Sequence, residues 1–134
     1  MKRNIFMALI LGIFFISCAT QTQGLSQNAT YNITSISLNE ILVESPQGAT
    51  FTVENSKIYG NTGCNNYFTD FKWIDKSIIE IGSNGGATKM MCDKDTNEFE
   101  WIFLKHLVGK FNVTAIDNGI TLDNGNFTIT LKNR

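Results

Sequence analysis

The chain has 134 residues, of which 11 are basic and 12 are acidic, so its formal net charge is −1. Nucleic-acid-binding domains usually carry a basic excess, and this near-neutral composition predicts no nucleic-acid partner. The length is that of one domain with a modest hydrophobic core.

A secretory signal is predicted at the start of the chain. The stretch "MKRNIFMALILGIFFISCAT" has basic residues at Lys2 and Arg3, an apolar run over residues 5–16, and small residues around Cys18. The apolar run is shorter than the roughly 20 residues that a membrane-spanning helix needs, and the residues after it are polar. We therefore predict a signal peptide over residues 1–17.

The cysteine that follows is a candidate lipidation site. The stretch "FISC" resembles the bacterial lipobox, in which a small residue such as Ser17 precedes a cysteine that is acylated and becomes the mature N-terminus. Phe15 stands where leucine is usual. The resemblance implies a lipid anchor on Cys18 and, because Ala19 follows, a place on the outer membrane facing the periplasm. The alternative is an ordinary cleaved signal peptide that leaves Cys18 as a spare thiol.

Cleavage before Cys18 would remove 17 of the 134 residues and leave 117. It would also remove two basic residues, Lys2 and Arg3, so the net charge would change from −1 to −3. Residues 18–30 are polar and lack apolar periodicity, which predicts a flexible tether between the lipid and a domain over residues 31–134.

Most of the predicted domain consists of strands. In "TFTVEN" the side chains of Phe51 and Val53 share one face, and the Asn55-Ser56 turn signal joins this strand to "KIYG" as a hairpin. The stretch "NYFTDFKWI" carries apolar or aromatic groups on both faces, which is typical of a central strand. Further strands are predicted in "SIIEIG", "KFNVTAI", "GITL" and "FTITLK". The last three are separated by two "DNG" turns and predict a meander.

A single helix interrupts the strands. The spacing predicts a helix over about Asp95–Val108, with Asp95 as N-cap, Glu98 as its capping-box partner and Gly109 as the C-terminal stop. Apolar residues recur at i, i+3, i+4 and i+8, which gives the helix one broad apolar face: Phe99, Ile102, Phe103 and Leu107.

Many antiparallel strands and one amphipathic helix predict an α+β fold. The helix needs an apolar partner and the sheet needs one face covered, so we predict a curved antiparallel sheet of about seven or eight strands wrapped around the helix. A parallel arrangement would require repeated alternation of strands and helices, which the sequence lacks.

Candidate catalytic and metal-binding groups are few. Cys64 as a nucleophile would need a base, and the chain has one histidine, His106. The cysteines lack the close spacing of a zinc site, and the Asp93 and Asp95 carboxylates suit a helix N-terminus whether or not they catalyse a reaction. Neither a GxxxxGK[ST] phosphate loop nor a GxSxG elbow occurs. We predict no enzyme activity, no cofactor and no metal.

Cys64 and Cys92 are candidates for a disulfide. Both follow the signal sequence, and the export compartment is oxidising. Closing a loop of roughly 30 residues should contribute about 3 to 4 kcal/mol to the free energy of unfolding. The alternative is two separate thiols that serve as packing residues.

Two linked motifs resemble those of the META/HslJ domain family. The stretch "GNTGCNNYF" resembles the family's G-x-x-GCN turn, and "ATKMMC" resembles the T-[RK]-M-x-C stretch that leads into its helix. The resemblance covers about residues 31–133. Asn66 replaces the aromatic or basic residue that often follows GCN, Lys89 replaces the commoner arginine, and the first strand lacks the family's frequent tryptophan. The motif residues are Gly60, Gly63, Cys64, Asn65, Thr88, Lys89, Met90 and Cys92.

The resemblance implies an envelope lipoprotein, which in some relatives is linked to heat shock, antibiotic tolerance, or secretion and motility. It implies no catalytic residue. Two function classes follow. The first is a noncatalytic module, anchored to the membrane by its lipid, that binds an envelope protein, a peptide or a lipid at a strand edge or at the mouth of the sheet. The second is a thiol-disulfide redox protein or enzyme that uses Cys64 and Cys92, the latter close to a helix N-terminus.

Overall fold

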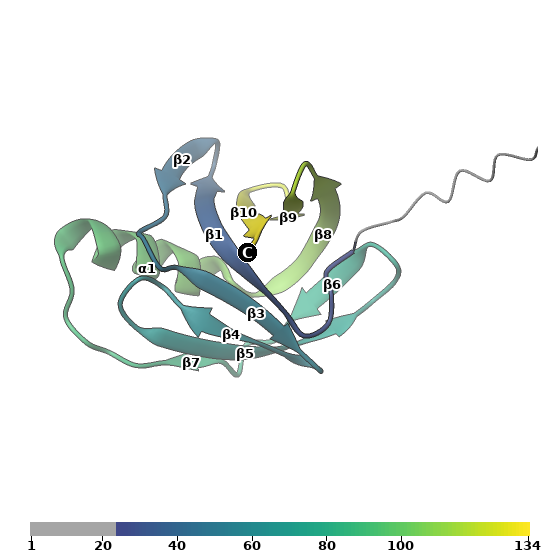
Figure 1. Cartoon of the computed structure of the whole chain (residues 1–134), viewed down its shortest axis with the longest axis horizontal. Helices are drawn as coiled ribbons and strands as arrows, with labels where there is room; N and C mark the ends of the chain where they lie inside the picture. Colours follow the sequence, from purple (N-terminus) through teal and green to yellow (C-terminus); the bar gives the residue numbers. More distant parts are fainter. Residues whose placement is uncertain (1–23) are drawn as a thin grey trace, which may run out of the picture.

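The computed structural model describes residues 24–134, which form ten strands and one helix. Figure 1 shows their arrangement. The elements in chain order are β1 (Ala29–Leu38), β2 (Ile41–Glu44), β3 (Thr50–Glu54), β4 (Lys57–Asn61), β5 (Asn66–Trp73), β6 (Ile78–Ile81), β7 (Gly86–Ala87), α1 (Lys94–His106), β8 (Gly109–Ile116), β9 (Gly119–Asp123) and β10 (Phe127–Asn133).

Eight of the strands form a closed antiparallel barrel. Each strand in the order β1-β3-β4-β5-β6-β8-β9-β10 pairs with the next, and β10 pairs with β1 from Tyr31↔Asn133 to Leu38↔Phe127. We predicted a curved antiparallel sheet of about seven or eight strands wrapped around the helix; the β-rich fold with one helix is confirmed, but the sheet closes on itself as a barrel. Closure pairs the backbone edges that an open sheet would leave exposed. The two short strands outside the ring are β2, beside β1, and β7, beside β5.

The predicted turns and hairpins occur in the structure. The β3–β4 hairpin turns at Asn55, and the β8–β9 hairpin turns at Asn118, both with a positive φ. Asparagine tolerates this left-handed backbone better than most residues do, which explains the strength of these signals in the sequence. The β8–β9–β10 meander is confirmed.

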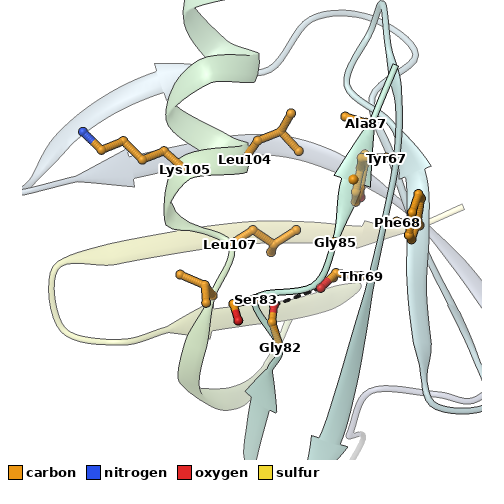
Figure 2. Close-up of a pocket in the computed structure, with 12 residues that line it drawn as sticks. Tyr67, Phe68, Thr69, Gly82, Ser83, Gly85, Ala87, Leu104, Lys105 and Leu107 are labelled. Atoms are coloured by element: carbon orange, nitrogen blue, oxygen red, sulfur yellow. Dashed lines mark hydrogen bonds between the residues drawn. The ribbon is translucent and has the colours of Figure 1, made fainter. Parts of the chain in front are cut away.

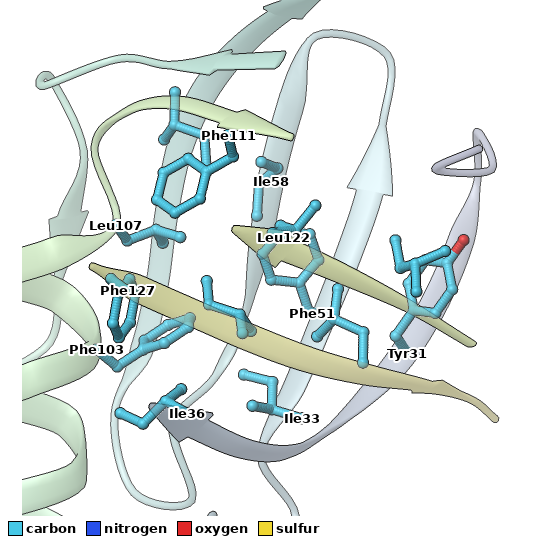
Figure 3. Close-up of a cluster of buried hydrophobic side chains, with 14 of the residues drawn as sticks. Tyr31, Ile33, Ile36, Phe51, Ile58, Phe103, Leu107, Phe111, Leu122 and Phe127 are labelled. Carbon is cyan, nitrogen blue, oxygen red and sulfur yellow. The ribbon is translucent and has the colours of Figure 1, made fainter. Parts of the chain in front are cut away.

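The helix lies across one end of the barrel. In an antiparallel barrel the starts of β5, β8 and β10 lie at the same end, and the buried face of α1 meets residues from these starts. The Phe103 ring lies 5.1 Å from that of Tyr67 on β5, and the His106 ring lies 5.4 Å from that of Phe127 on β10. Figure 3 shows Phe103 and Leu107 pointing from the helix into the core. We call this the helix end of the barrel.

The helix begins one residue earlier than predicted, and its N-cap is Asp93 rather than Asp95. The Asp93 carboxylate accepts hydrogen bonds from the Thr96 backbone N–H (3.1 Å) and from the Thr96 hydroxyl (2.7 Å). Two aspartates two residues apart offer alternative caps, and the threonine three residues after Asp93 favours the first. The helix ends at His106, and Gly109, with φ +93°, starts β8.

The folded part of the chain begins before Tyr31. Leu25 is buried in the core, and the Ser26 backbone N–H donates a hydrogen bond to the Tyr31 hydroxyl (3.0 Å). The tether predicted for residues 18–30 therefore overlaps the domain, because β1 starts at Ala29. The signal peptide predicted for residues 1–17 and the predicted lipidation site, Cys18, lie outside the described residues.

Candidate functional site

The two glycines of the first motif allow a close approach of the backbone. A Cβ atom on Gly60 would lie 2.2 Å from the carbonyl oxygen of Thr50 on β3. Gly63 has φ +99°, and a Cβ there would lie 2.6 Å from the Cβ of Pro46. No side chain fits at either position without movement of the backbone, so both glycines serve the architecture of the turn.

The two cysteines of the motifs meet in space. Cys64, in the turn between β4 and β5, forms a disulfide with Cys92, just before α1, and their Cα atoms are 6.3 Å apart. Both side chains are half-buried. The bond joins the barrel wall to the start of the helix. His106, the base considered for Cys64, lies at the opposite end of the 13-residue helix and does not approach it.

Asn65 is the centre of a buried hydrogen-bond network. Its amide oxygen accepts hydrogen bonds from the Thr88 hydroxyl (3.0 Å) and the Met90 backbone N–H (2.6 Å). Its amide nitrogen donates to the Met90 carbonyl (3.1 Å) and to a carboxylate oxygen of Glu100 (2.8 Å) on α1. The second oxygen of that carboxylate accepts a hydrogen bond from the Thr62 hydroxyl. We call these five residues the Asn65 cluster.

The Asn65 cluster ties together three segments that are distant in the sequence. It joins the β4–β5 turn, the segment after β7 and the outer side of the helix. Glu100 completes it, and the sequence analysis missed this residue because an acidic side chain on a helix is usually solvated. Lys89 is exposed, and so is most of the Met90 side chain, which takes part through its backbone. The arrangement explains the motifs as a structural clamp.

A groove lies beside the Asn65 cluster, between the second half of α1 and the segment Gly82–Ala87. It encloses about 350 Å³. On the helix side it is lined by Leu104, Leu107 and Val108, and Val108 is 42% exposed. Figure 2 shows Leu104 and Leu107 directed toward the strand segment, while Lys105 points away. The Lys105 ammonium lies 4.5 Å from the centre of the Trp101 ring, outside the groove.

The opposite wall of the groove is rich in glycine and has a backbone edge. Within the described part of the chain, β7 pairs with β5 alone, through Tyr67↔Ala87 and Phe68↔Gly86. A Cβ atom on Gly85 would lie 2.5 Å from the Phe68 carbonyl oxygen, so only glycine lets this segment lie so close to β5. The other edge of β7 pairs with no strand in this part of the chain, and an unpaired edge can accept a further strand.

The Tyr67 side chain forms the inner end of the groove and is fixed. Its hydroxyl donates a hydrogen bond to the Thr50 carbonyl (2.7 Å), and burial raises the pKa of this hydroxyl well above its ordinary value of 10.0. Tyr67 therefore stays neutral and offers no general base. Among residues 24–134, no group of three or more His, Cys, Asp or Glu side chains is placed to hold a metal ion. In the same range, α1 is too short and too polar to span a bilayer.

Comparison with known proteins identifies relatives by sequence and by fold. The family model described as META domain matches residues 23–134. No curated protein matches the chain. A protein from Burkholderia xenovorans, solved by NMR, superposes with a TM-score of 0.65 at 20% identity, over 81% of this chain and 83% of that one. A second NMR structure gives a TM-score of 0.58 at 22% identity, over 79% and 89% of the two chains. At such identities these structures share the fold.

Proposed function

The chain belongs to the META domain family, and from this premise we propose that it is a noncatalytic envelope lipoprotein that binds an extended apolar segment of a partner in the groove beside α1. The lipid anchor would be Cys18, and the place of action would be the periplasmic face of the outer membrane. The observation that carries the proposal is that one edge of β7, which pairs with no strand within residues 24–134, faces an apolar wall of the helix across one groove.

An extended segment suits this groove for two reasons. Its backbone can add to the edge of β7, since strand addition forms main-chain hydrogen bonds whatever the partner's sequence. Its apolar side chains can lie against Leu104 and Val108, which line the opposite wall. The glycines at positions 85 and 86 keep the edge accessible to a second backbone. The volume accommodates a few side chains and excludes a folded domain.

The lipid anchor is tested by mass. Wild-type protein and the Cys18→Ala variant are purified from whole cells and from their membrane fraction, and we expect the mature wild-type chain to start at Cys18 and to carry the added mass of acyl chains. The variant should lack that mass and should leave the membrane fraction. A wild-type chain that begins at another residue, or that begins at Cys18 without added mass, would refute the anchor.

The groove is tested by photo-crosslinking in the envelope. A photoreactive amino acid replaces Val108, which is 42% exposed in the groove, or Tyr59, which is 39% exposed on the outer wall of β4. We expect adducts from position 108. In a separate experiment without the photoreactive residue, the Val108→Asp variant should keep its thermal stability and should capture less of the partner that those adducts identify. Equal adducts from both positions, or none from position 108, would contradict the proposed site.

Thiol-disulfide exchange is a second candidate function. The half-buried Cys64–Cys92 bond favours it, together with the position of Cys92 immediately before the N-cap of α1. The reduction potential separates the two candidates. A structural disulfide should have a potential below roughly −300 mV, while an exchange catalyst is more easily reduced.

A further inference from the structure

We propose that the turn between β5 and β6 rests on the phospholipid surface to which the chain is anchored, with Trp73 and Ile74 inserted into the interface. We call residues Trp73–Lys76 the hairpin tip. This inference rests on the proposed lipid anchor at Cys18, and it adds an orientation that the anchor alone does not give.

The first argument is the place where the described part of the chain begins. The described part of the chain begins beside the turn between β5 and β6 (Figure 1), and a Cβ atom on its first residue, Gly24, would lie 3.8 Å from the Trp73 ring. Gly24 and the hairpin tip also line one shared surface hollow. Five residues lie between Cys18 and Gly24, and the six steps from one Cα to the next span at most about 20 Å when the chain is fully extended. An anchor at Cys18 therefore holds this end of the barrel close to the bilayer.

The second argument is the chemistry of the hairpin tip. Trp73 is 37% exposed and Ile74 is 45% exposed, side by side at a turn. Tryptophan has an apolar body and one N–H donor, and it concentrates at the level of lipid headgroups in membrane proteins. Lys76 is exposed beside them, and a long basic side chain can bury its methylene groups while the ammonium stays among the headgroups.

The one acidic residue of the hairpin tip, Asp75, is exposed and accepts hydrogen bonds from its own turn. The Asp75 carboxylate accepts hydrogen bonds from the backbone N–H groups of Ser77 (2.8 Å) and Ile78 (2.9 Å), so its charge is used within the turn. The helix end of the barrel carries exposed residues of both signs, so it offers anionic lipids no net charge attraction: Asp93, Asp95 and Glu98 with Lys89, Lys94 and Lys105. The bilayer is therefore the occupant that fits the hairpin tip, and the groove beside α1 would face away from it.

The two tryptophans of the chain make the orientation measurable. Trp73 is in the hairpin tip, and Trp101 is on α1, 61% exposed at the other end of the barrel. Trp101→Phe leaves Trp73 as the only reporter, and Trp73→Phe leaves Trp101. The mature chain, from Cys18 onward, is coupled through the Cys18 thiol to a maleimide-headgroup lipid in phosphatidylethanolamine and phosphatidylglycerol vesicles. With Cys64 and Cys92 joined, Cys18 has the one free thiol among the three cysteines.

The readout is quenching by phospholipids that carry bromine near the headgroup end of the acyl chains. We expect Trp73 to lose fluorescence and to shift its emission to shorter wavelength, and we expect Trp101 to change in neither respect. In the Trp101→Phe background, Ile74→Asp should reduce the loss, while Ile41→Asp, an exposed position at the helix end, should not. Unquenched Trp73, or quenching of Trp101 as strong as that of Trp73, would overturn the inference. Because the coupling is chemical, neither result depends on acylation by cells or on binding in the groove.

Discussion

Replacing Asn65 with alanine should destabilise the fold more than any other single change in the motifs that leaves the backbone and the disulfide intact. The Asn65 side chain is fully buried and makes four hydrogen bonds, one of them to the Glu100 carboxylate. A bond between neutral groups contributes about 1 kcal/mol to the free energy of unfolding, and one to a charged group about 1.5 to 3 kcal/mol. Water can replace part of this at Met90 and Thr88, which are exposed. We expect a loss of about 3 kcal/mol.

The assay is urea unfolding of the mature chain with the disulfide intact. Asn65→Ala should lower the midpoint without changing the slope, since the surface exposed on unfolding is nearly the same. The matched control is Asn66→Ala, because the exposed Asn66 side chain accepts one hydrogen bond, from the amide of Asn61 (2.9 Å), and its loss should cost less than about 1 kcal/mol. Asn65→Asp should lower the urea midpoint more than Asn65→Ala does at neutral pH, since it places a second carboxylate against that of Glu100.

The reasoning about the Asn65 cluster would be refuted by an Asn65→Ala midpoint close to that of the wild type. It would also be refuted if Asn66→Ala were equally damaging, because the loss would then belong to the turn as a whole. Glu100→Gln provides a further check. The glutamine keeps a hydrogen-bond acceptor for the Asn65 amide or the Thr62 hydroxyl, so Glu100→Gln should lower the urea midpoint less than Glu100→Ala does.

Three other changes give distinct signatures. Cys64→Ala with Cys92→Ala should lower the free energy of unfolding by roughly 3 to 4 kcal/mol in the urea assay, and a reductant should then have no further effect. Gly60→Ala should lower the thermal midpoint far more than Gly82→Ala, because a Cβ on Gly60 meets a backbone carbonyl oxygen at 2.2 Å while a Cβ on Gly82 meets nothing closer than 3.5 Å. Hydrogen bonds from the Thr96 side chain and backbone hold the pKa of the Asp93 carboxyl below its ordinary value of 3.8. The stability that this carboxylate contributes to the fold is therefore complete above pH 3.8, and it is lost as the pH falls through the lower pKa of the folded state. Acid unfolding of Asp93→Ala should therefore be less steep there than that of the wild type, and an unchanged acid profile would contradict the capping role.

Local patterns predicted the elements well. The stripe of Phe99, Ile102 and Phe103 identified the helix, and all three residues are buried. The turns at Asn55 and Asn118 fixed the hairpins, because few residues other than glycine tolerate their backbone angles. These features depend on residues within a few positions of one another, which is the range over which a single sequence carries information.

Closure of the barrel and the Asn65 cluster were not predictable in the same way. Tyr31 pairs with Asn133 across nearly the whole domain, and no local pattern reports such a contact. Glu100 bonds to two residues of the distant β4–β5 turn, Thr62 and Asn65, and on its own helix it looks like an ordinary solvated acidic residue. The motif indicated that Asn65 matters but not which groups it joins. The choice between Asp93 and Asp95 as N-cap depended on Thr96, whose side chain completes the cap.

The pairing of β10 with β1 has a consequence for the order in which the molecule can form. The two strands are the last and the first of the barrel, so the ring cannot be completed until residues 127–133 are available. A chain still being synthesised therefore lacks the β10 partner that β1 has in the finished domain. Contacts between such distant segments slow folding, because a long loop must close before they form. The same pairing that closes the barrel thus keeps an incomplete chain open until its last strand is available.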